Sequence, residues 1–142
     1  MNLHEGPLKI VLADATAFRR FAKRLDPIQV RLVQDSIDNI LAIHGLSLLA
    51  EGDWLKSLGA GLFEFRIGPT TSSVYSQIIR NSPEYLKPSH RKMLIRIFVS
   101  FEGLNLVIIC GAYDKLDDSS KRRQQLEVVK ARKALRLYLA GH

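Results

Sequence analysis

The chain has 142 residues, of which 46% are hydrophobic and 25% are charged, a composition typical of one ordinary globular domain. No apolar run approaches the roughly 20 residues that a membrane span needs, and the start of the chain does not have the pattern of a secretory signal. The 21 Lys and Arg residues exceed the 14 Asp and Glu residues by a net charge of +7. Seven of the basic residues and one acidic residue lie between Ser119 and His142. This one-sided segment is either a solvated helix face or a surface that binds polyanions.

The first predicted elements are a strand at Leu8–Ala13 and a helix at Ala15–Leu25, whose apolar residues form one stripe. Asp26–Pro27 supplies an N-cap acid followed by a proline at the first helical position. This pattern predicts a second helix that runs to about His44 and stops at Gly45, so that the two helices form an antiparallel hairpin. The predicted buried stripe of the second helix consists of Val30, Val33, Ile37, Ile40 and Leu41.

The middle of the chain is less regular. Gly45–Gly61 carries large apolar residues, and we expect it to be a packed linker. Leu62–Ile67 alternates between apolar and charged residues, which predicts a strand with one face in the core. Gly68–Arg91 is broken by three prolines and is predicted to be an insertion, within which Ser72–Arg80 has the spacing of a short helix.

Two further strands are predicted at Met93–Phe101 and Leu106–Tyr113, with a hairpin turn over the four residues between them. The second strand is almost entirely apolar and contains the one cysteine, Cys110, which we expect to be a buried thiol in a reducing compartment. A final helix is predicted from about Lys121 to Leu139. The order β-α-α-β-β-β-α predicts an α+β fold in which residues 1–142 form a single domain.

Four local patterns occur in a recognisable order along this frame. They are Leu55-Lys56-Ser57-Leu58 followed by Gly59-Ala60-Gly61-Leu62-Phe63-Glu64-Phe65-Arg66; Ile95-Arg96-Ile97-Phe98; Gly111-Ala112-Tyr113-Asp114-Lys115; and Lys121-Arg122-Arg123-Gln124-Gln125 leading into Glu127 and Ala131-Arg132. Together they resemble the RelE/HigB-like toxins of bacterial type II toxin–antitoxin pairs, within the RelE/ParE superfamily. The resemblance covers about Leu8 to Leu139, apart from the insertion.

The resemblance implies a small, mostly antiparallel sheet with an N-terminal helical hairpin and a C-terminal helix. It also implies a cytoplasmic toxin that inhibits translation by cutting mRNA, often on the ribosome. A cognate antitoxin, encoded next to the toxin, would silence it. A related branch, ParE, poisons DNA gyrase instead, and a fold resemblance alone does not separate the two activities. A third possibility is a module of the same fold that binds RNA or antitoxin without catalysis.

Metal-free RNA cleavage needs a general base, positive donors for the charged transition state and an acid for the leaving oxygen. Arg66 and Arg96 match positions where the family carries a phosphate-binding arginine. The alternative for each of them is a structural salt bridge, with Glu64 as the candidate partner. Tyr113 and Lys115 follow the last strand. Tyr113 would stack on a base or donate a proton, or else be a packed aromatic, and Lys115 would stabilise phosphate or act as an acid or base.

Further cations are expected to bind RNA: Lys56, Lys121, Arg122 and Arg123. The last three occupy the first turn of the final helix, which is unfavourable for cations unless nearby acids or an RNA phosphate compensate them. His90 is the remaining candidate acid or base, because many HigB-like members carry a histidine where this chain has Cys110–Ala112. No residue spacing indicates a metal site, and no cofactor is expected. The nuclease hypothesis requires Arg66, Arg96 and Lys115 to converge on one open hollow that can seat a phosphodiester. It fails if these residues lie on opposite sides of the sheet or are locked in ion pairs beneath the surface.

Overall fold

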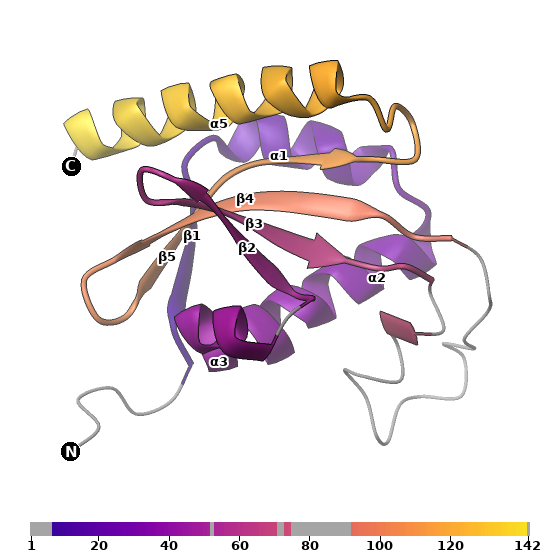
Figure 1. Cartoon of the computed structure of the whole chain (residues 1–142), viewed down its shortest axis with the longest axis horizontal. Coiled ribbons are helices and arrows are strands. Elements are labelled where there is room, and N and C mark those ends of the chain that lie inside the picture. Colours follow the sequence, from indigo (N-terminus) through magenta and orange to yellow (C-terminus); the bar gives the residue numbers. More distant parts are fainter. Residues whose placement is uncertain (1–6, 52, 71–72, 75–91, 142) are drawn as a thin grey trace.

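The computed structural model describes residues 7–51, 53–70, 73–74 and 92–141. Figure 1 shows a five-stranded sheet with helices on both sides. The strands are β1 (Lys9–Leu12), β2 (Leu55–Gly59), β3 (Leu62–Ile67), β4 (Ile95–Glu102) and β5 (Leu106–Asp114). The helices are α1 (Ala15–Lys23), α2 (Pro27–Ser36), the π-helical turn η1 (Ile37–Leu41), α3 (Ala42–His44), the 3₁₀ helix η2 (Gly45–Glu51) and α5 (Lys121–Ala140). The predicted α+β fold is confirmed.

The strands lie in the order β1-β5-β4-β3-β2. β1 pairs with β5 in parallel, and the other neighbouring strands pair antiparallel. The sheet is therefore mixed and mostly antiparallel. β1 is short, and its pairing with β5 ends at Leu12 and Ile109. Among the described residues, no strand lies beside the rest of β5, toward Asp114, on that side.

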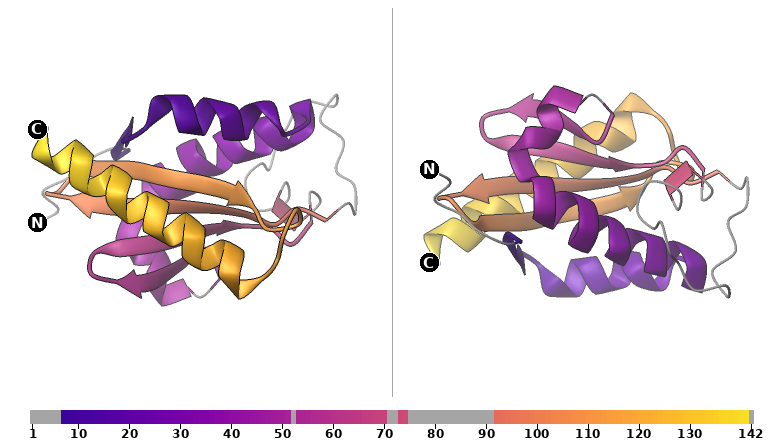
Figure 2. Two further views of the ribbon diagram at one scale, coloured as in Figure 1. Left: turned by 90° about the horizontal axis from the view of Figure 1, so that it is seen from above. Right: turned by 90° about the horizontal axis from the view of Figure 1, so that it is seen from below.

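The two faces of the sheet are covered by different helices. α5 crosses one face, α2 crosses the other, and α1 runs along the β5 side of the sheet (Figure 2). On β3, Phe63, Phe65 and Ile67 belong to the larger core, which contains the N-terminal helices, as their alternation predicts. Leu62 belongs to the smaller core under α5.

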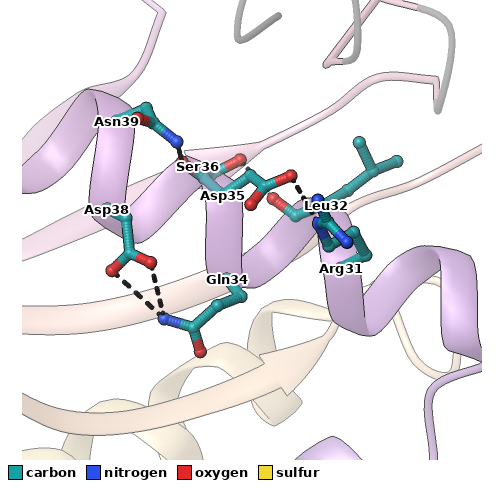
Figure 3. Close-up of polar contacts among 7 residues, drawn as sticks. All are labelled: Arg31, Leu32, Gln34, Asp35, Ser36, Asp38 and Asn39. Carbon is teal, nitrogen blue, oxygen red and sulfur yellow. Dashed lines mark hydrogen bonds and ion pairs between the residues drawn. The ribbon is translucent and has the colours of Figure 1, made fainter. Parts of the chain in front are cut away.

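The second predicted helix is one continuous helical run with a π-helical turn inside it. Ser36 Oγ donates to the Leu32 carbonyl within this run, and Gln34 donates to Asp38 on its exposed side (Figure 3). Asp26 begins the run with a reciprocal capping box, and Gly45, at a φ of 52°, ends it. The predicted stripe is wrong at Val30, which is exposed, because the buried side of α2 contains Leu32 instead.

The segment predicted to be a linker, 45–61, forms η2 and the additional strand β2. β2 pairs with β3 through a tight hairpin, in which Gly59, Ala60 and Gly61 all have positive φ. The strand has five residues, and its burial does not alternate cleanly, so its sequence pattern is weak. The helix predicted at Ser72–Arg80 lies, apart from residues 73–74, outside the described residues.

Candidate functional site

Glu64 lies at the centre of a buried ionic cluster on the α5 side of the sheet. Its Oε1 accepts a hydrogen bond from Arg66 Nε at 3.2 Å and lies 3.8 Å from Arg96 Nε. Its Oε2 accepts a hydrogen bond from Gln124 Nε2 at 2.9 Å, which ties α5 to β3. The salt bridge that was the alternative reading of Arg96 is therefore present, and Arg66 shares it.

The sheet register explains why these groups meet. Arg66 and Arg96 are directly paired residues of the antiparallel strands β3 and β4, so their side chains leave the sheet on the same face. Two like charges opposite each other on a sheet repel. Glu64, two residues before Arg66 on the same strand, supplies the opposite charge on that face.

The cluster keeps one positive charge in excess, since two guanidinium groups share one carboxylate. Arg96 donates from Nη1 to its neighbour's carbonyl at 3.1 Å, whereas its buried Nε has no hydrogen-bond partner among the described residues. Burial lowers the pKa of Arg96, the charge of Glu64 raises it, and the charge of Arg66 lowers it. An anion close to this pair would relieve the repulsion between the two guanidinium groups.

Both arginines line one hollow of about 470 Å³ at the end of β3 where β4 begins. Its other lining residues are Asp53, Trp54, Gly68, Pro69 and Leu94. The Arg66 side chain is 34% exposed and the Arg96 side chain 11%, so Arg66 is the more accessible cation. The hollow thus combines two phosphate-type donors with one acidic residue, Asp53.

Sequence reasoning missed Asp53 and Trp54. They lie in the segment predicted to be a linker, and nothing in its pattern pointed to a site. The structure fixes them by a sheet-like contact, because the Arg66 amide donates to the Trp54 carbonyl at 2.8 Å. The Trp54 ring stacks on Phe65, with ring centroids 5.5 Å apart, so the core strand supports this wall of the hollow.

Tyr113 is buried as a packed aromatic, not within the lining of the arginine hollow. Its ring stacks on Phe98 with centroids 6.0 Å apart, and the Arg123 guanidinium lies 5.3 Å from its centroid. Burial raises the pKa of its hydroxyl. A bulge in the pairing of β4 with β5 shifts the alternation, which places Tyr113 in the same cluster as Ile108 and Cys110.

Lys115 follows β5, and its amide donates to the Leu94 carbonyl. Its side chain is partly exposed, but the described lining of the arginine hollow does not include it. The expected convergence of three cations is therefore not found: Arg66 and Arg96 line the hollow, but Lys115 does not. Both arginines are also ion-paired with Glu64, and Arg96 is buried, so Arg66 is the one accessible cation of the three that lines the hollow. His90 lies outside the described residues.

The predicted RNA-binding cations separate into exposed and paired groups. Lys56, Lys121 and Arg122 are exposed. Lys56 is the β2 partner of Glu64 in the sheet register, so it emerges on the same face as the arginine pair. Arg123 instead lies over Tyr113 and donates to Glu127 at 3.1 Å.

A carboxylate and a capping hydroxyl, from Asp118 and Ser120, lie just before the first turn of α5. Ser120 is the N-cap residue and accepts a hydrogen bond from the Arg123 amide. The Asp118 carboxylate accepts from the Ser120 amide, and hydrogen bonds from Ser120 lower the pKa of Asp118. Part of the unfavourable effect of cations in this first turn is therefore offset within the chain.

A second hollow, a groove of about 510 Å³, lies between α1 and α5. Its floor is formed by the part of β5 beyond its pairing with β1, from Cys110 to Asp114. Its charged lining is mixed, and Glu127 pairs with both Arg123 and Lys130. The basic lining residues are Arg20, Arg24, Arg123, Lys130 and Lys133, and the acidic ones are Asp14, Asp114, Asp117 and Glu127. Tyr113 lines this groove and also belongs to the smaller core under α5. The groove therefore borders the same sheet face that holds Glu64.

Within the described ranges, no helix has the length and apolarity to cross a membrane, and no group of three or more His, Cys, Asp or Glu side chains is placed to hold a metal ion. Comparison with protein-family models, curated proteins and solved structures finds no match to this chain.

Proposed function

We propose that this chain is a RelE/HigB-like toxin that inhibits translation by cutting mRNA without a metal ion, at the ribosome and in the cytoplasm. The observation that carries the proposal is the arginine pair. Arg66 and Arg96 face one hollow, share a single carboxylate and retain a net positive charge. The ordered sequence motifs described above supply the family, and the hollow supplies a place for the chemistry.

A phosphodiester suits this hollow because its oxygens match the planar forks of two guanidinium groups. The negative charge of the substrate increases at phosphorus during 2′-oxygen attack, and preorganised cations stabilise that change. Arg96 is held by Glu64 and by the Ile95 carbonyl, so its orientation is fixed before RNA binds. Lys56, on the same sheet face, would contact the flanking phosphates.

The proposal is tested by incubating the purified chain with mRNA, with and without translating ribosomes, and mapping the cut sites. Arg66→Ala should lower the cleavage rate by about 10²-fold, since removal of one transition-state donor commonly costs that much. Arg96→Lys keeps the charge but removes the planar fork, and it should also slow cleavage. The matched control is Arg19→Ala, because Arg19 is exposed on α1 and does not line the hollow.

Two results would redirect the proposal. Intact mRNA together with accumulated cleaved DNA complexes would indicate a gyrase-directed toxin of the same fold. RNA or antitoxin binding without any cleavage, unchanged by Arg66→Ala, would indicate a non-catalytic module. The absence of growth inhibition on induction in a bacterial host, with no RNA cleavage in vitro, would contradict the toxin function.

We further propose that a cognate antitoxin, encoded next to this chain, binds in the groove between α1 and α5. The edge of β5 lies open there, and an extended peptide can add to an open strand edge. The groove lining has five basic and four acidic residues, and Glu127 already pairs with Arg123 and Lys130. Arg20, Arg24 and Lys133 are therefore the cations that acidic residues of the peptide would contact. Co-expression with the neighbouring gene should restore growth and yield a complex. Arg20→Glu with Lys133→Glu should weaken that complex, whereas the control Lys23→Glu should not.

A further inference from the structure

The arginine hollow contains an acidic residue that the resemblance to known toxins does not assign. Asp53 is exposed, and it lines the hollow together with Arg66 and Arg96. The next residue, Trp54, accepts a backbone hydrogen bond from Arg66. The backbone bond therefore ties Trp54 to Arg66, and Asp53, the residue before Trp54, shares the hollow with both arginines.

Other groups near the sheet are less suited to accept a proton from a substrate. Glu64 is buried, its two oxygens already meet three donor side chains, and the described lining of the hollow does not include it. Tyr113 is buried under α5 and lines the other groove. Among the described residues that line the hollow, Asp53 is the one with a carboxylate.

We propose that Asp53 is the general base of the RNA cleavage, an inference that rests on the proposed function. Its carboxylate takes the proton of the 2′-hydroxyl, and the 2′-oxygen attacks the adjacent phosphorus while Arg66 and Arg96 stabilise the added charge. The bond from phosphorus to the 5′-oxygen breaks, and the departing oxygen takes a proton from solvent. The products are a 2′,3′-cyclic phosphate and a free 5′-hydroxyl, and Asp53 returns its proton to water.

The test compares the full chain with Asp53→Asn, which has nearly the same shape but cannot accept the proton. Single-turnover cleavage should fall by about 10²- to 10⁴-fold. Affinity for an uncleavable RNA with a 2′-deoxy nucleotide at the cut site should change little. Asp53→Glu should recover part of the rate.

The outcomes separate this inference from the proposed function. If the unchanged chain cuts RNA and Asp53→Asn cuts it equally fast, the base is another group and the inference is wrong while the function stands. Loss of cleavage in His90→Asn, with Asp53→Asn fully active, would identify His90 instead. If the unchanged chain cuts no RNA under any condition, both proposals fail together. Terminal phosphate analysis gives a further check, since a product other than the cyclic phosphate excludes this step.

Discussion

Glu64 is almost completely buried, yet it meets two guanidinium groups and one amide. A buried carboxylate is costly unless charges and hydrogen bonds replace the water that it loses. Here the sheet register supplies both arginines, and α5 supplies Gln124. The same contacts orient Arg96 toward the hollow, so Glu64 is a positioning residue for the proposed phosphate site.

Replacing Glu64 with Gln should destabilise the fold by about 3 kcal/mol, the lower end of what removing one partner of a buried ion pair costs. The buried guanidinium of Arg96 would lose its compensating charge, and the repulsion from Arg66 would remain. Urea unfolding followed by circular dichroism measures the change. Glu102→Gln is the control, because Glu102 lies at the end of β4 away from the cluster. Equal unfolding free energies for Glu64→Gln and Glu102→Gln would mean that the ion pairs of Glu64 do not contribute to the stability of the fold.

Cys110 should make the stability of the fold depend on pH in the alkaline range. Burial raises the pKa of its thiol from 9.0 to about 12. Between these values the folded chain holds a proton that the unfolded chain has released. The contribution of the thiol to the free energy of unfolding is therefore constant below pH 9.0 and falls as the pH rises toward 12. The slope for one proton is at most about 1.4 kcal/mol per pH unit.

The measurement is the difference in unfolding free energy between the unchanged chain and Cys110→Ala as a function of pH. The difference isolates the thiol, because both proteins retain the other groups that titrate in this range, Tyr113 included. A constant difference from pH 8 to 11 would show that the folded state accommodates the thiolate.

At the scale of elements, α5 rests on the sheet at a point of very close approach. Ala131 is fully buried, and Gly111 of β5 lies beneath it. A methyl group built on Gly111 would stand 3.6 Å from the Ala131 Cβ, which is ordinary contact, so small residues set this spacing. The spacing in turn lets Gln124 reach Glu64 from the first turns of the helix.

Ala131→Leu should therefore lift α5 and destabilise the fold by about 1–3 kcal/mol, the usual cost of overpacking. It should also slow RNA cleavage, because the contact between Gln124 and Glu64 would lengthen. Val129→Leu is the matched control, since Val129 is exposed on the same helix. Chemical denaturation and the cleavage assay together test this coupling. A stable Ala131→Leu protein with full activity would show that the helix position does not matter for the site.

At the scale of the whole molecule, the net charge of +7 favours any polyanion, so a measure of specific contacts is needed. Each phosphate contact with single-stranded RNA contributes about 0.7 to the slope of log affinity against log salt concentration. Lys121 and Arg122 are both exposed at the start of α5. If both contact phosphates, their removal should change the slope and not merely the affinity.

The double variant Lys121→Ala with Arg122→Ala should reduce this salt slope by about 1.4. Fluorescence anisotropy with a labelled RNA, titrated at several salt concentrations, gives the slope. The control removes the same charge from α1, which lies across the groove from α5, with Arg19→Ala and Lys23→Ala. An equal change in both double variants would indicate diffuse attraction without a defined RNA path.

The sequence by itself determined the elements with strong periodicity. Alternation on β3 and the apolar run of β5 identified core strands, and the Asp26–Pro27 pair located the start of α2, because these signals depend on neighbours along the chain. It also identified Arg66 and Arg96 as candidates, since a cation in an apolar strand needs an anion or an opening. Strand β2 was missed, because a short strand with little alternation depends on its partner for its identity.

Only the tertiary structure decided which side chains meet. The pairing of β3 with β4 placed Arg66 opposite Arg96, and the bulge in the pairing of β4 with β5 put Tyr113 directly opposite Arg96 on the α5 face, packed under α5 and outside the lining of the arginine hollow. Asp53 joined the arginine hollow through a contact between segments with no shared sequence pattern. Register, bulges and contacts between distant segments arise from packing of the whole chain, so local sequence patterns do not specify them.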